Sequence, residues 1–392
     1  MLDEIYLIIS ILLAGEILVK IECLRQSELL WKIVLSTDDE PNVSSLWLGK
    51  YQMRYGVSVL RVGGIGGVAT DEMYRHQGFA RRIMEESSTW MNSQDFDVAM
   101  LFGIPNFYHK FGYATVLPET WIDIEVQDVH NANLEYQIRT FEMANLPEIL
   151  EIYHSNNADR VGTLIRNPDL WRRFNRGITW EQSANPFVVV DSNDQVTGYF
   201  FRGEDSNHVT VSEIGFLDQS IFPSILRFLA NYANQVSVNQ LRFSIPQDHP
   251  FSVFCRRFGT QTAVCHRRCG GGMMRLIRQT ATLKKMCYEL TRRLQKSAEF
   301  IKWQGIIEIS TDLGTDLIKI DNGHVDHQEN STSKLRYKLE IAQNKLAQLM
   351  MGRRTAEDLV WDSNVSVSTE IIDLLDCLFP THYPHVWWPD RF

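Results

Sequence analysis

The chain has 392 residues, enough for two or three domains at roughly 100 to 200 residues each. Hydrophobic residues make up 44% and charged residues 22%, which are ordinary proportions for a globular protein. The formal net charge of −9 disfavours nucleic acid or an anionic membrane as a partner, and we predict neither. Six cysteines without regular spacing are too few for a disulfide framework and indicate a reducing compartment.

An apolar run at residues 6–14 lies close to the N-terminus. Its nine residues are too few to cross a bilayer, which needs about 20, and the preceding Asp3 and Glu4 are unlike the positive leader of a signal peptide. We therefore predict buried secondary structure here and a cytoplasmic protein. Residues 31–37 and 43–55 follow as the two strands of a hairpin.

The stretch from residue 60 to residue 113 predicts strand, turn, helix and strand. Residues 60–70 are an extended apolar run, and residues 98–102 form a second short one. Between them an amphipathic helix opens on a turn of small residues. Its apolar side chains recur at helical spacing at Phe79, Ile83, Met84, Trp90 and Met91.

The turn before this helix predicts an anion site. Backbone N–H groups and the positive end of the helix dipole converge there, which suits a phosphate. Gly78 permits close approach of the anion, and Ala80 keeps a bulky side chain away. Arg75, Arg81 and Arg82 supply positive charge, and the whole matches a pyrophosphate.

The glycines of residues 64–69 fit a dinucleotide-binding pattern only loosely, because no helix opens directly after them. We interpret them as points in a strand where another backbone or a ligand passes close by.

A polar segment at residues 127–135 predicts a linker, after which the order of elements repeats. The repeated elements are a strand at 136–141, a helix at 146–154, a hairpin at 187–202, a strand at 209–216, a helix at 222–234 and a strand at 241–246. Residues 218–223 replace the anion-binding turn. They contain no glycine, and Asp218 would repel a phosphate, so we predict a copy that does not bind the ligand.

A third block begins with an amphipathic helix at 281–297. Strands follow at 305–311, 316–321, 324–329 and 334–341, then helices at 346–351, 356–361 and 369–379. The segment from Arg256 to Lys296 contains eleven basic residues and one acidic residue, Glu289. We interpret this positive charge as a solvent-exposed surface, with a binding site for a polyanion as the alternative. Cys265 and Cys269 lack a second pair of ligands, so we predict free cysteines and no metal.

Three features of the first block together resemble the GCN5-related N-acetyltransferases (GNAT). They are the strand at 68–70, the Arg-x-x-Gly-x-Ala pattern at 75–80, and the loop Asn-Phe-Tyr-His-Lys-Phe-Gly-Tyr at 106–113. The resemblance implies acetyl-CoA as co-substrate and an opening strand and two helices that wall the acceptor site. It also implies that loop amides hold the pyrophosphate, that the strand bonds the pantetheine arm, and that Tyr108 protonates the departing thiolate.

The residues that the resemblance assigns to acetyl-CoA are Val68, Ala69, Thr70, Arg75, His76, Gln77, Gly78, Phe79, Ala80, Arg81, Gly103 and Ile104.

The three blocks in this order resemble the enhanced intracellular survival (Eis) family. The implied fold class is α/β (α+β), with tandem GNAT folds, each a mixed sheet flanked by helices, followed by a sterol-carrier-protein-like α/β domain. The implied domains are a catalytic one at 1–126, a degenerate copy at 136–280 and the carrier-like one at 281–392. In that family the carboxylate of the last residue, here Phe392, is the general base, and the protein is a homo-oligomer.

The implied reaction is direct acetyl transfer to a primary amine. The acceptor could be a small polyamine, a lysine side chain or an aminoglycoside-like antibiotic, although Arg391 beside the terminal carboxylate disfavours a polycation. A free α-carboxylate, with a pKa of roughly 3.5, is a useful base only where it is desolvated or the ammonium is acidified. Asp71, His109 and Asp390 are competing bases, and we interpret them as structural groups or charge partners.

Two other functions stay open at this stage. One is a non-catalytic acyl-CoA- or lipid-binding protein that uses the carrier-like domain. The other is a nucleic-acid-associated factor that uses the basic segment, which the net charge disfavours.

Overall fold

The computed structural model describes residues 5–6, 12–14, 17–129, 131–166, 168, 176–330 and 335–392. These residues form two compact units, which we describe separately. The first unit contains the described residues up to Leu117, residues 267–384 and Phe392, and the second contains residues 118–266 and 385–391.

A mixed sheet, nine-stranded over the described residues, is the centre of the first unit. Its order is β1-β3-β4-β5-β6-β7-β16-β8, and β2 pairs with the free side of β3. All pairs are antiparallel except β6 with β7. The strands are β1 (Ile5–Tyr6), β2 (Leu12–Ala14), β3 (Ile17–Ser27), β4 (Leu30–Thr37), β5 (Ser44–Tyr55), β6 (Ser58–Thr70), β7 (Val98–Gly103), β8 (Ala114–Thr115) and β16 (Gly271–Leu276).

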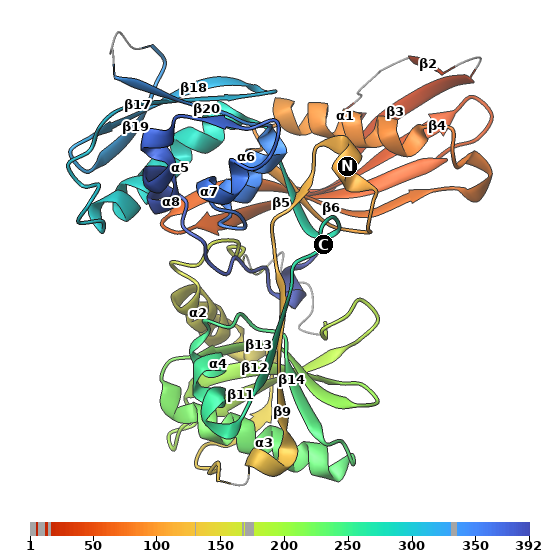
Figure 1. Ribbon diagram of the computed structural model, residues 1–392. Helices are drawn as coiled ribbons and strands as arrows, with labels where there is room; N and C mark the ends of the chain where they lie inside the picture. Colours follow the sequence, from red (N-terminus) through yellow and green to blue (C-terminus); the bar gives the residue numbers. More distant parts are fainter. Residues whose placement is uncertain are drawn as a thin grey trace. The chain divides into compact units, whose positions relative to one another are not determined.

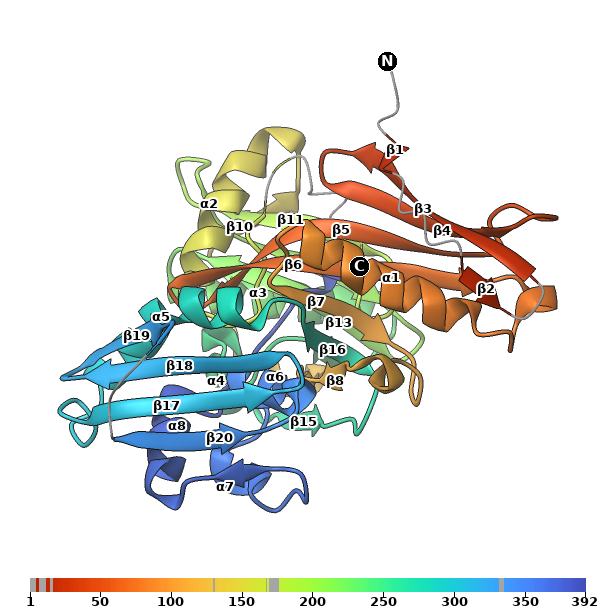
Figure 2. The same cartoon turned by 90° about the horizontal axis from the view of Figure 1, so that it is seen from above.

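Helix α1 (Phe79–Ser93) covers one face of β4, β5 and β6 (Figure 2). Its predicted apolar stripe is buried in a core with side chains of these strands. The α-helical periodicity and the strand pattern around it therefore predicted this layer correctly.

The N-terminal region differs from the expectation. Residues 17–27 form β3, which pairs with β4, and the described residues before Gly78 contain strands and a single 3-10 turn but no α-helix. The prediction of two helices, which the GNAT resemblance implied here, is thus wrong for residues 17–30. The predicted apolar run at 6–14 lies partly outside the described residues, and its ends belong to β1 and β2.

A second sheet of the first unit has the order β19-β18-β17-β20-β21, and α5, α6, α7 and α8 gather on one face of it (Figures 1 and 2). This sheet is consistent with an additional α/β domain, whereas the sterol-carrier likeness stays a prediction. The elements are α5 (Gln279–Gln295), β17 (Gln304–Thr311), β18 (Gly314–Asp321), β19 (His324–Gln328), β20 (Arg336–Glu340), α6 (Gln343–Met350), α7 (Ala356–Leu359), β21 (Ser366–Val367) and α8 (Ile372–Leu378).

Helix α5 also contacts β6 of the first sheet, and its charged side chains bind Tyr55 at the end of β5 and Asp97 just before β7. The Glu289 carboxylate, 2% exposed, accepts hydrogen bonds from Arg292 and Arg293, and Arg293 also donates to the Tyr55 hydroxyl at 3.1 Å. Lys285 donates to buried Asp97 at 2.5 Å. The buried carboxylates of Glu289 and Asp97 thus each have a cationic partner, and a buried ion without one would be costly.

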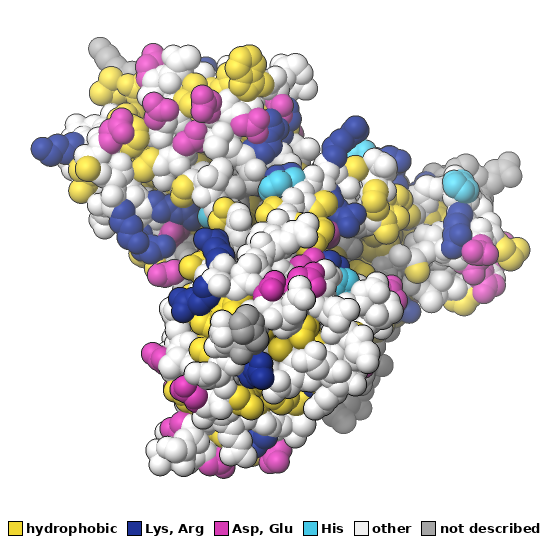
Figure 3. Space-filling model, turned by 60° about the horizontal axis from the view of Figure 1, so that its bottom comes forward, with side chains coloured by type: hydrophobic (Ala, Val, Ile, Leu, Met, Phe, Trp, Pro, Cys, Tyr) yellow, Lys and Arg dark blue, Asp and Glu magenta, His cyan; other side chains and the backbone are white. Residues whose placement is uncertain are grey.

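The predicted solvated face of the basic segment is therefore corrected in part. Arg275 donates to the Phe111 carbonyl and Arg278 pairs with Asp95, so much of this positive charge serves contacts within the first unit. On the face drawn in Figure 3, basic and acidic side chains are interspersed.

The sheet of the second unit has the order β10-β11-β12-β13-β14-β9-β15, and only β13 with β14 is parallel (Figure 1). Its aromatic and β-branched residues form one core with α2, α3 and α4. The elements are β9 (Glu119–Glu125), β10 (Gln137–Thr140), α2 (Leu146–Asn156), β11 (Ala184–Val190), β12 (Val196–Glu204), β13 (His208–Phe216), α3 (Phe222–Gln235), β14 (Gln240–Phe243), α4 (Pro250–Cys255) and β15 (Gln261–Cys265).

Two strands lie in sheets that the predicted domain ranges do not give them. Strand β9, inside the predicted range 1–126, pairs with β14 and β15 of the second unit. Strand β16, inside the range 136–280, pairs with β7 and β8 of the first unit. Strand propensity reveals that a strand exists, but not which sheet receives it.

Two further observations concern predicted absences. No helix in the described part of the chain is long and apolar enough to cross a membrane. All six cysteines are free in the structure.

Two buried histidines of the second unit make its stability dependent on pH. Burial lowers the pKa of His249, which caps α4, to about 3, and burial holds the pKa of His385 well below its usual value. The unfolded chain binds a proton on each below about pH 6.5, whereas the folded chain does not. We expect the free energy of unfolding to fall on acidification from pH 7 to pH 4, by up to about 1.4 kcal/mol per pH unit per histidine.

Denaturant titrations at several pH values would measure this slope. In the control His249→Asn, the asparagine still caps the helix but cannot titrate, so the slope should become shallower. Equal slopes in both proteins would contradict the prediction.

Candidate active site

Strands β6 and β7 diverge at one end of the first sheet. Their parallel pairing begins with Val62 beside Val98 and ends with Ile65 beside Leu101. Strand β6 then continues to Thr70, and on its β7 side no described strand lies beside these last residues. A register shift against β5 accompanies the divergence, and Gly67 there has a φ of 57°. The Thr70 carbonyl accepts a long hydrogen bond, 3.5 Å, from Nε of the exposed Arg75, and the other backbone groups of residues 68–70 that point away from β5 face the opening, where a ligand can bind them.

The N-terminus of α1 lies beside this opening. Gly78 is its N-cap, with a φ of 84° and no capping side chain, and an added Cβ there would meet nothing within 4 Å. The first N–H groups of any helix have no partners within it, so those of Phe79, Ala80 and Arg81 face the space before the helix. That space is a cavity of about 630 Å³.

Positive charge dominates the cavity. Arg75, Arg81 and Lys110 line it, and none of its described lining residues is acidic. Arg75 and Arg81 make ion pairs with Glu72 at 3.0 Å and Glu85 at 3.5 Å, and all four side chains are more than half exposed. Exposed pairs of this kind are worth at most about 1 kcal/mol, so both guanidinium groups can turn to a phosphate. The turn is therefore suited to an anion, and its binding of a pyrophosphate stays a prediction.

Tyr108 lies at the other wall of the cavity. It begins a 3-10 turn, Tyr108–Phe111, that ends at Gly112. Its ring packs against Gly103 at the end of β7, where an added Cβ would lie 2.5 Å from the ring, and Phe107 contacts it edge-on. Burial raises the pKa of Tyr108, which keeps the phenol protonated near neutral pH.

Phe392 lies against the same end of the sheet. Its ring stacks on Tyr51, with centroids 5.0 Å apart, and meets the edge of Phe102 at 5.7 Å. Its carboxyl carbon lies over Gly66, where an added Cβ would be 2.9 Å from that carbon. The glycine in the strand thus admits another part of the chain, which agrees with the interpretation of residues 64–69 as points of close approach.

Tyr108 and Phe392 occupy opposite faces of the sheet. Successive residues of a strand point to opposite faces, and Tyr108 packs on Gly103 while Phe392 packs on Phe102. On β6, Gly63 likewise faces Met91 of α1, whereas Gly66 faces Phe392. The opening between β6 and β7 therefore has a phenol on the α1 face and a carboxyl group on the other.

Most residues predicted to bind acetyl-CoA line the cavity, together with Tyr108. They are Val68, Ala69, Thr70, Arg75, His76, Gly78, Phe79, Ala80, Arg81 and Ile104. Gln77 and Gly103 do not line it, and Gly103 instead gives Tyr108 room. Sequence reasoning missed Tyr74, Phe107, Lys110 and Phe111 as lining residues, although three of them lie in the aromatic motif that it singled out.

The three competing bases have other partners or surroundings. Asp71 accepts a hydrogen bond from the Met73 N–H at 2.9 Å and caps the turn. Asp390 accepts hydrogen bonds from Arg166 in the second unit. His109 is exposed and does not line the cavity.

The second unit repeats this opening but fills it with its own groups. Phe216 and Thr70 each lie five residues past the last parallel pair of their strand. The Asn156 side chain donates to the Phe216 carbonyl at 2.8 Å and accepts from its N–H at 2.9 Å. Asp218 accepts from the Ser220 N–H at 2.8 Å in the turn that replaces the anion site.

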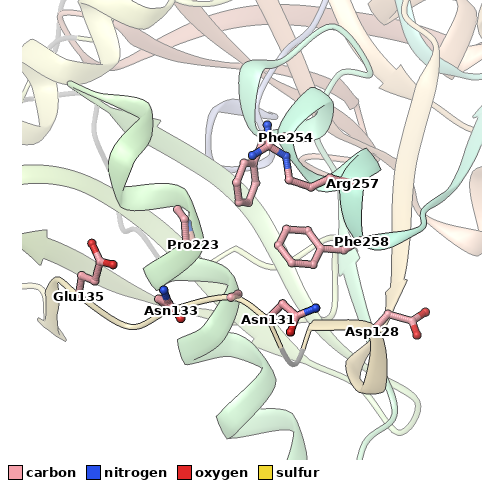
Figure 4. A pocket seen from close by; sticks show the side chains of 9 residues that line it. Asp128, Asn131, Asn133, Glu135, Pro223, Phe254, Arg257 and Phe258 are labelled. Atoms are coloured by element: carbon pink, nitrogen blue, oxygen red, sulfur yellow. The ribbon is translucent and has the colours of Figure 1, made fainter.

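A separate hollow of about 560 Å³ lies near the start of α3 (Figure 4). Asp128 and Glu135 line it, while the guanidinium of Arg257 stacks on Phe254 at 4.8 Å. Two carboxylates against one arginine make it unsuitable for a phosphate.

Two acetyltransferase (GNAT) domain families match the chain, one at residues 24–116 and another at 162–276. Among solved structures, a probable N-acyltransferase from Enterococcus faecalis has a TM-score of 0.73 at 18% identity, covering 93% of this chain and 89% of that one. A GCN5-related N-acetyltransferase from Anabaena variabilis has a TM-score of 0.72 at 15% identity, covering 92% and 89%. A comparison with curated protein sequences gives no match.

The fold and the two domain matches define this chain as an acyltransferase of the GNAT family. GNAT domains use an acyl-CoA such as acetyl-CoA, and the cavity beside α1 fits its pyrophosphate. Within the family the fold is Eis-like: Eis1 from Mycobacterium abscessus has a TM-score of 0.62 at 16% identity, covering 92% of this chain and 91% of that one.

Replacement of Gly78 by aspartate tests the anion site, because it introduces a negative charge like that of Asp218 in the corresponding turn of the second unit. We expect Gly78→Asp to weaken acetyl-CoA binding roughly 10-fold to 100-fold relative to Gly78→Asn. Both side chains tolerate a positive φ and have the same size, so the difference isolates the charge. Isothermal titration calorimetry would measure both affinities, and equal affinities would place the pyrophosphate elsewhere.

Proposed function

We propose that this protein transfers the acetyl group of acetyl-CoA directly to a primary amine, with Tyr108 as general acid and the Phe392 carboxylate as general base. One observation carries the proposal. Tyr108 and Phe392 pack on neighbouring residues of β7, on opposite faces of the opening between β6 and β7. A thioester bound on the α1 face and an amine on the other face would meet in that opening.

On the α1 face, Val68, Ala69 and Thr70 bond the pantetheine arm through their backbone groups. An N–H of this segment steadies the oxyanion that develops as the amine attacks. Tyr108 donates its proton to the departing sulfur, a role that suits a phenol kept protonated by burial.

On the opposite face, the Phe392 carboxylate removes a proton from the amine. An alkylammonium has a pKa near 10, so a base within hydrogen-bond reach is required. The rings of Tyr51 and Phe102 pack on the ring of Phe392 and hold the terminal residue at the opening, and a base of this kind is effective only where its surroundings desolvate it. The same rings also attract a cationic amine by cation–π interaction.

The acceptor is a small polyamine, a lysine side chain or an aminoglycoside-like amine. Arg391 was expected to disfavour a polycation. Its guanidinium stacks on Trp388 at 3.6 Å, and burial lowers its pKa to about 9, so it is committed to the second unit. Asp390 is committed to Arg166. A cationic acceptor is therefore compatible with the site.

The second GNAT domain serves another purpose than acyl-CoA binding in this proposal. Asn156 and Asp218 already bond the backbone groups that a pantetheine arm and a phosphate would need. A non-catalytic binding protein, the alternative that the sequence left open, disagrees with the acyltransferase assignment. A homo-oligomer in the cytoplasm stays a prediction.

Loss of the Tyr108 hydroxyl should slow the chemical step. We expect Tyr108→Phe to lower kcat about 100-fold or more, because general acid catalysis contributes at least that much, while acetyl-CoA affinity stays unchanged. In the unaltered enzyme, kcat should show no alkaline fall below about pH 10, since burial raises the Tyr108 pKa.

Thiol release from acetyl-CoA with a panel of amines would measure these rates. Tyr113→Phe removes a neighbouring buried hydroxyl, 6.5 Å away between ring centroids, and serves as the control. Similar activities of the two variants would exclude Tyr108 as the acid.

Displacement of the terminal carboxylate tests the base. We expect an extension of two residues beyond Phe392 to lower kcat about 100-fold, and Gly66→Ala, which crowds the carboxyl carbon, to lower it about 10-fold. Phe392→Leu retains the carboxylate and should keep most of the activity. A fully active extended enzyme would show that Phe392 is not the base.

A further inference from the structure

The C-terminal segment 385–391 is bound to the second GNAT domain at four successive places. The His385 N–H donates to the Val161 carbonyl, and Trp387 Nε1 donates to Asn157 Oδ1, each at 3.0 Å. Trp388 Nε1 donates to Ser244 Oγ at 3.0 Å.

The fourth place is a buried charge network at Asp390. Arg166 donates to Asp390 through Nε at 2.7 Å and through Nη2 at 3.0 Å, and to Glu213 of β13 at 2.7 and 2.5 Å. The Tyr153 hydroxyl donates to Asp390 at 3.0 Å, and its ring lies 3.7 Å from the guanidinium. The side chains of Arg166, Glu213 and Asp390 are at most 7% exposed.

Burial alone lowers the pKa of Arg166, but the two carboxylates more than offset this and hold it well above its usual value. A network of this kind contributes little net stability, because three ions must be desolvated to form it. What it does provide is a fixed geometry, since each ion has its hydrogen-bond partners in one arrangement only.

The bound segment lies where the second domain's own acyl-CoA opening would be. The turn Trp388–Asp390 contacts β13. Trp388 donates a hydrogen bond to the side chain of Ser244, the residue that follows β14. The Ser244 N–H in turn donates to the carbonyl of Val211, which belongs to the last parallel pair of β13 and β14. The strands β13 and β14 diverge from that pair onward. The corresponding place in the first domain is the opening between β6 and β7.

We infer that the second GNAT domain is a dock for the C-terminal segment, and that Arg166 and Asp390 are positioning residues that fix the Phe392 carboxylate for catalysis. The inference rests on the proposed role of Phe392 as general base. Only Arg391 separates Asp390 from Phe392, and the Arg391 carbonyl accepts a hydrogen bond from Arg176. Since consecutive Cα atoms are about 3.8 Å apart, a bound Arg391 leaves the Phe392 backbone little freedom.

An undocked segment would behave differently. Eight free residues would spread their end over a root-mean-square distance of roughly 15 Å, so the carboxylate would seldom be near the amine. Loss of the dock should therefore slow proton removal and leave acetyl-CoA binding intact.

The variant Asp390→Asn removes one charge of the network, while Arg166 keeps Glu213 and the amide oxygen can still accept from Tyr153. We expect kcat to fall about 10-fold to 100-fold, the KM for acetyl-CoA to stay within about 2-fold, and hydrogen exchange of the backbone amides of 385–391 to accelerate. The control is Asp123→Asn, which breaks a bidentate pair with Arg242 in the same sheet, at 2.7 Å for both bonds, away from the segment. It should leave kcat and KM unchanged.

The two-residue extension beyond Phe392 completes a double-mutant cycle. If Asp390 acts through Phe392, Asp390→Asn should have no further effect on kcat in the extended enzyme. An equal further loss there would mark a merely structural effect and overturn the inference. If Asp390→Asn does not fold, Ser244→Ala serves as a second test. It removes the hydrogen-bond acceptor of Trp388 without removing a charge, and it should also lower kcat.

The cycle also separates the inference from the proposed function. If Asp390→Asn accelerates exchange and leaves kcat unchanged, while the extension abolishes activity, the base assignment stands and the docking inference is wrong. If the extension itself leaves kcat unchanged, the Phe392 base is wrong, and the positioning role is wrong with it.

Discussion

The divergence of β6 from β7 is the constraint on which the rest of the first unit depends. Parallel strands that separate leave backbone N–H and C=O groups without partners, and these groups must be satisfied by something else. In the first unit, these backbone groups of β6 lie beside the N-terminus of α1 and its cationic turn. In the proposed mechanism, this single backbone feature provides a place for the pantetheine arm, an opening through the sheet, and two faces that hold the acid and the base apart.

The same divergence occurs between β13 and β14, and the two units resolve it differently. The second unit satisfies the exposed backbone with Asn156, caps the turn with Asp218 and packs aromatic residues of the C-terminal segment at the open end. A binding site and a packed scaffold are therefore two solutions of one structural problem. The choice between them depends on a few side chains, because the strand geometry is common to both.

Strands β9 and β16 make the chain more interwoven than three consecutive domains. Each lies in the interior of a sheet whose other strands come from a different stretch of the chain, β9 between β14 and β15, and β16 between β7 and β8. Neither sheet is continuous until a strand far away in the sequence has joined it. Helix α5 adds to this, because it packs against β6 and its Glu289 accepts a hydrogen bond from the Val57 N–H in the turn between β5 and β6. Contacts of such long range slow folding, because the entropy of closing a long loop is lost before the contact stabilises the chain.

The sequence by itself determined the local elements and the glycine-bearing turn at the start of α1. Helix α1, strand β6, Gly78 and the loop around Tyr108 depend on periodicity, turn chemistry and short motifs, all of which are encoded by neighbouring residues. Family resemblance added Phe392, which local patterns cannot reveal. The tertiary structure alone decided which sheets receive β9 and β16, that Lys285 of α5 pairs with buried Asp97, and that Asp390 pairs with Arg166. The physical reason for the strands is that backbone hydrogen-bonding groups are the same at every residue, so they do not specify a partner strand. The reason for the ion pairs is that the sequence shows each charge but not which distant residue will pair with it.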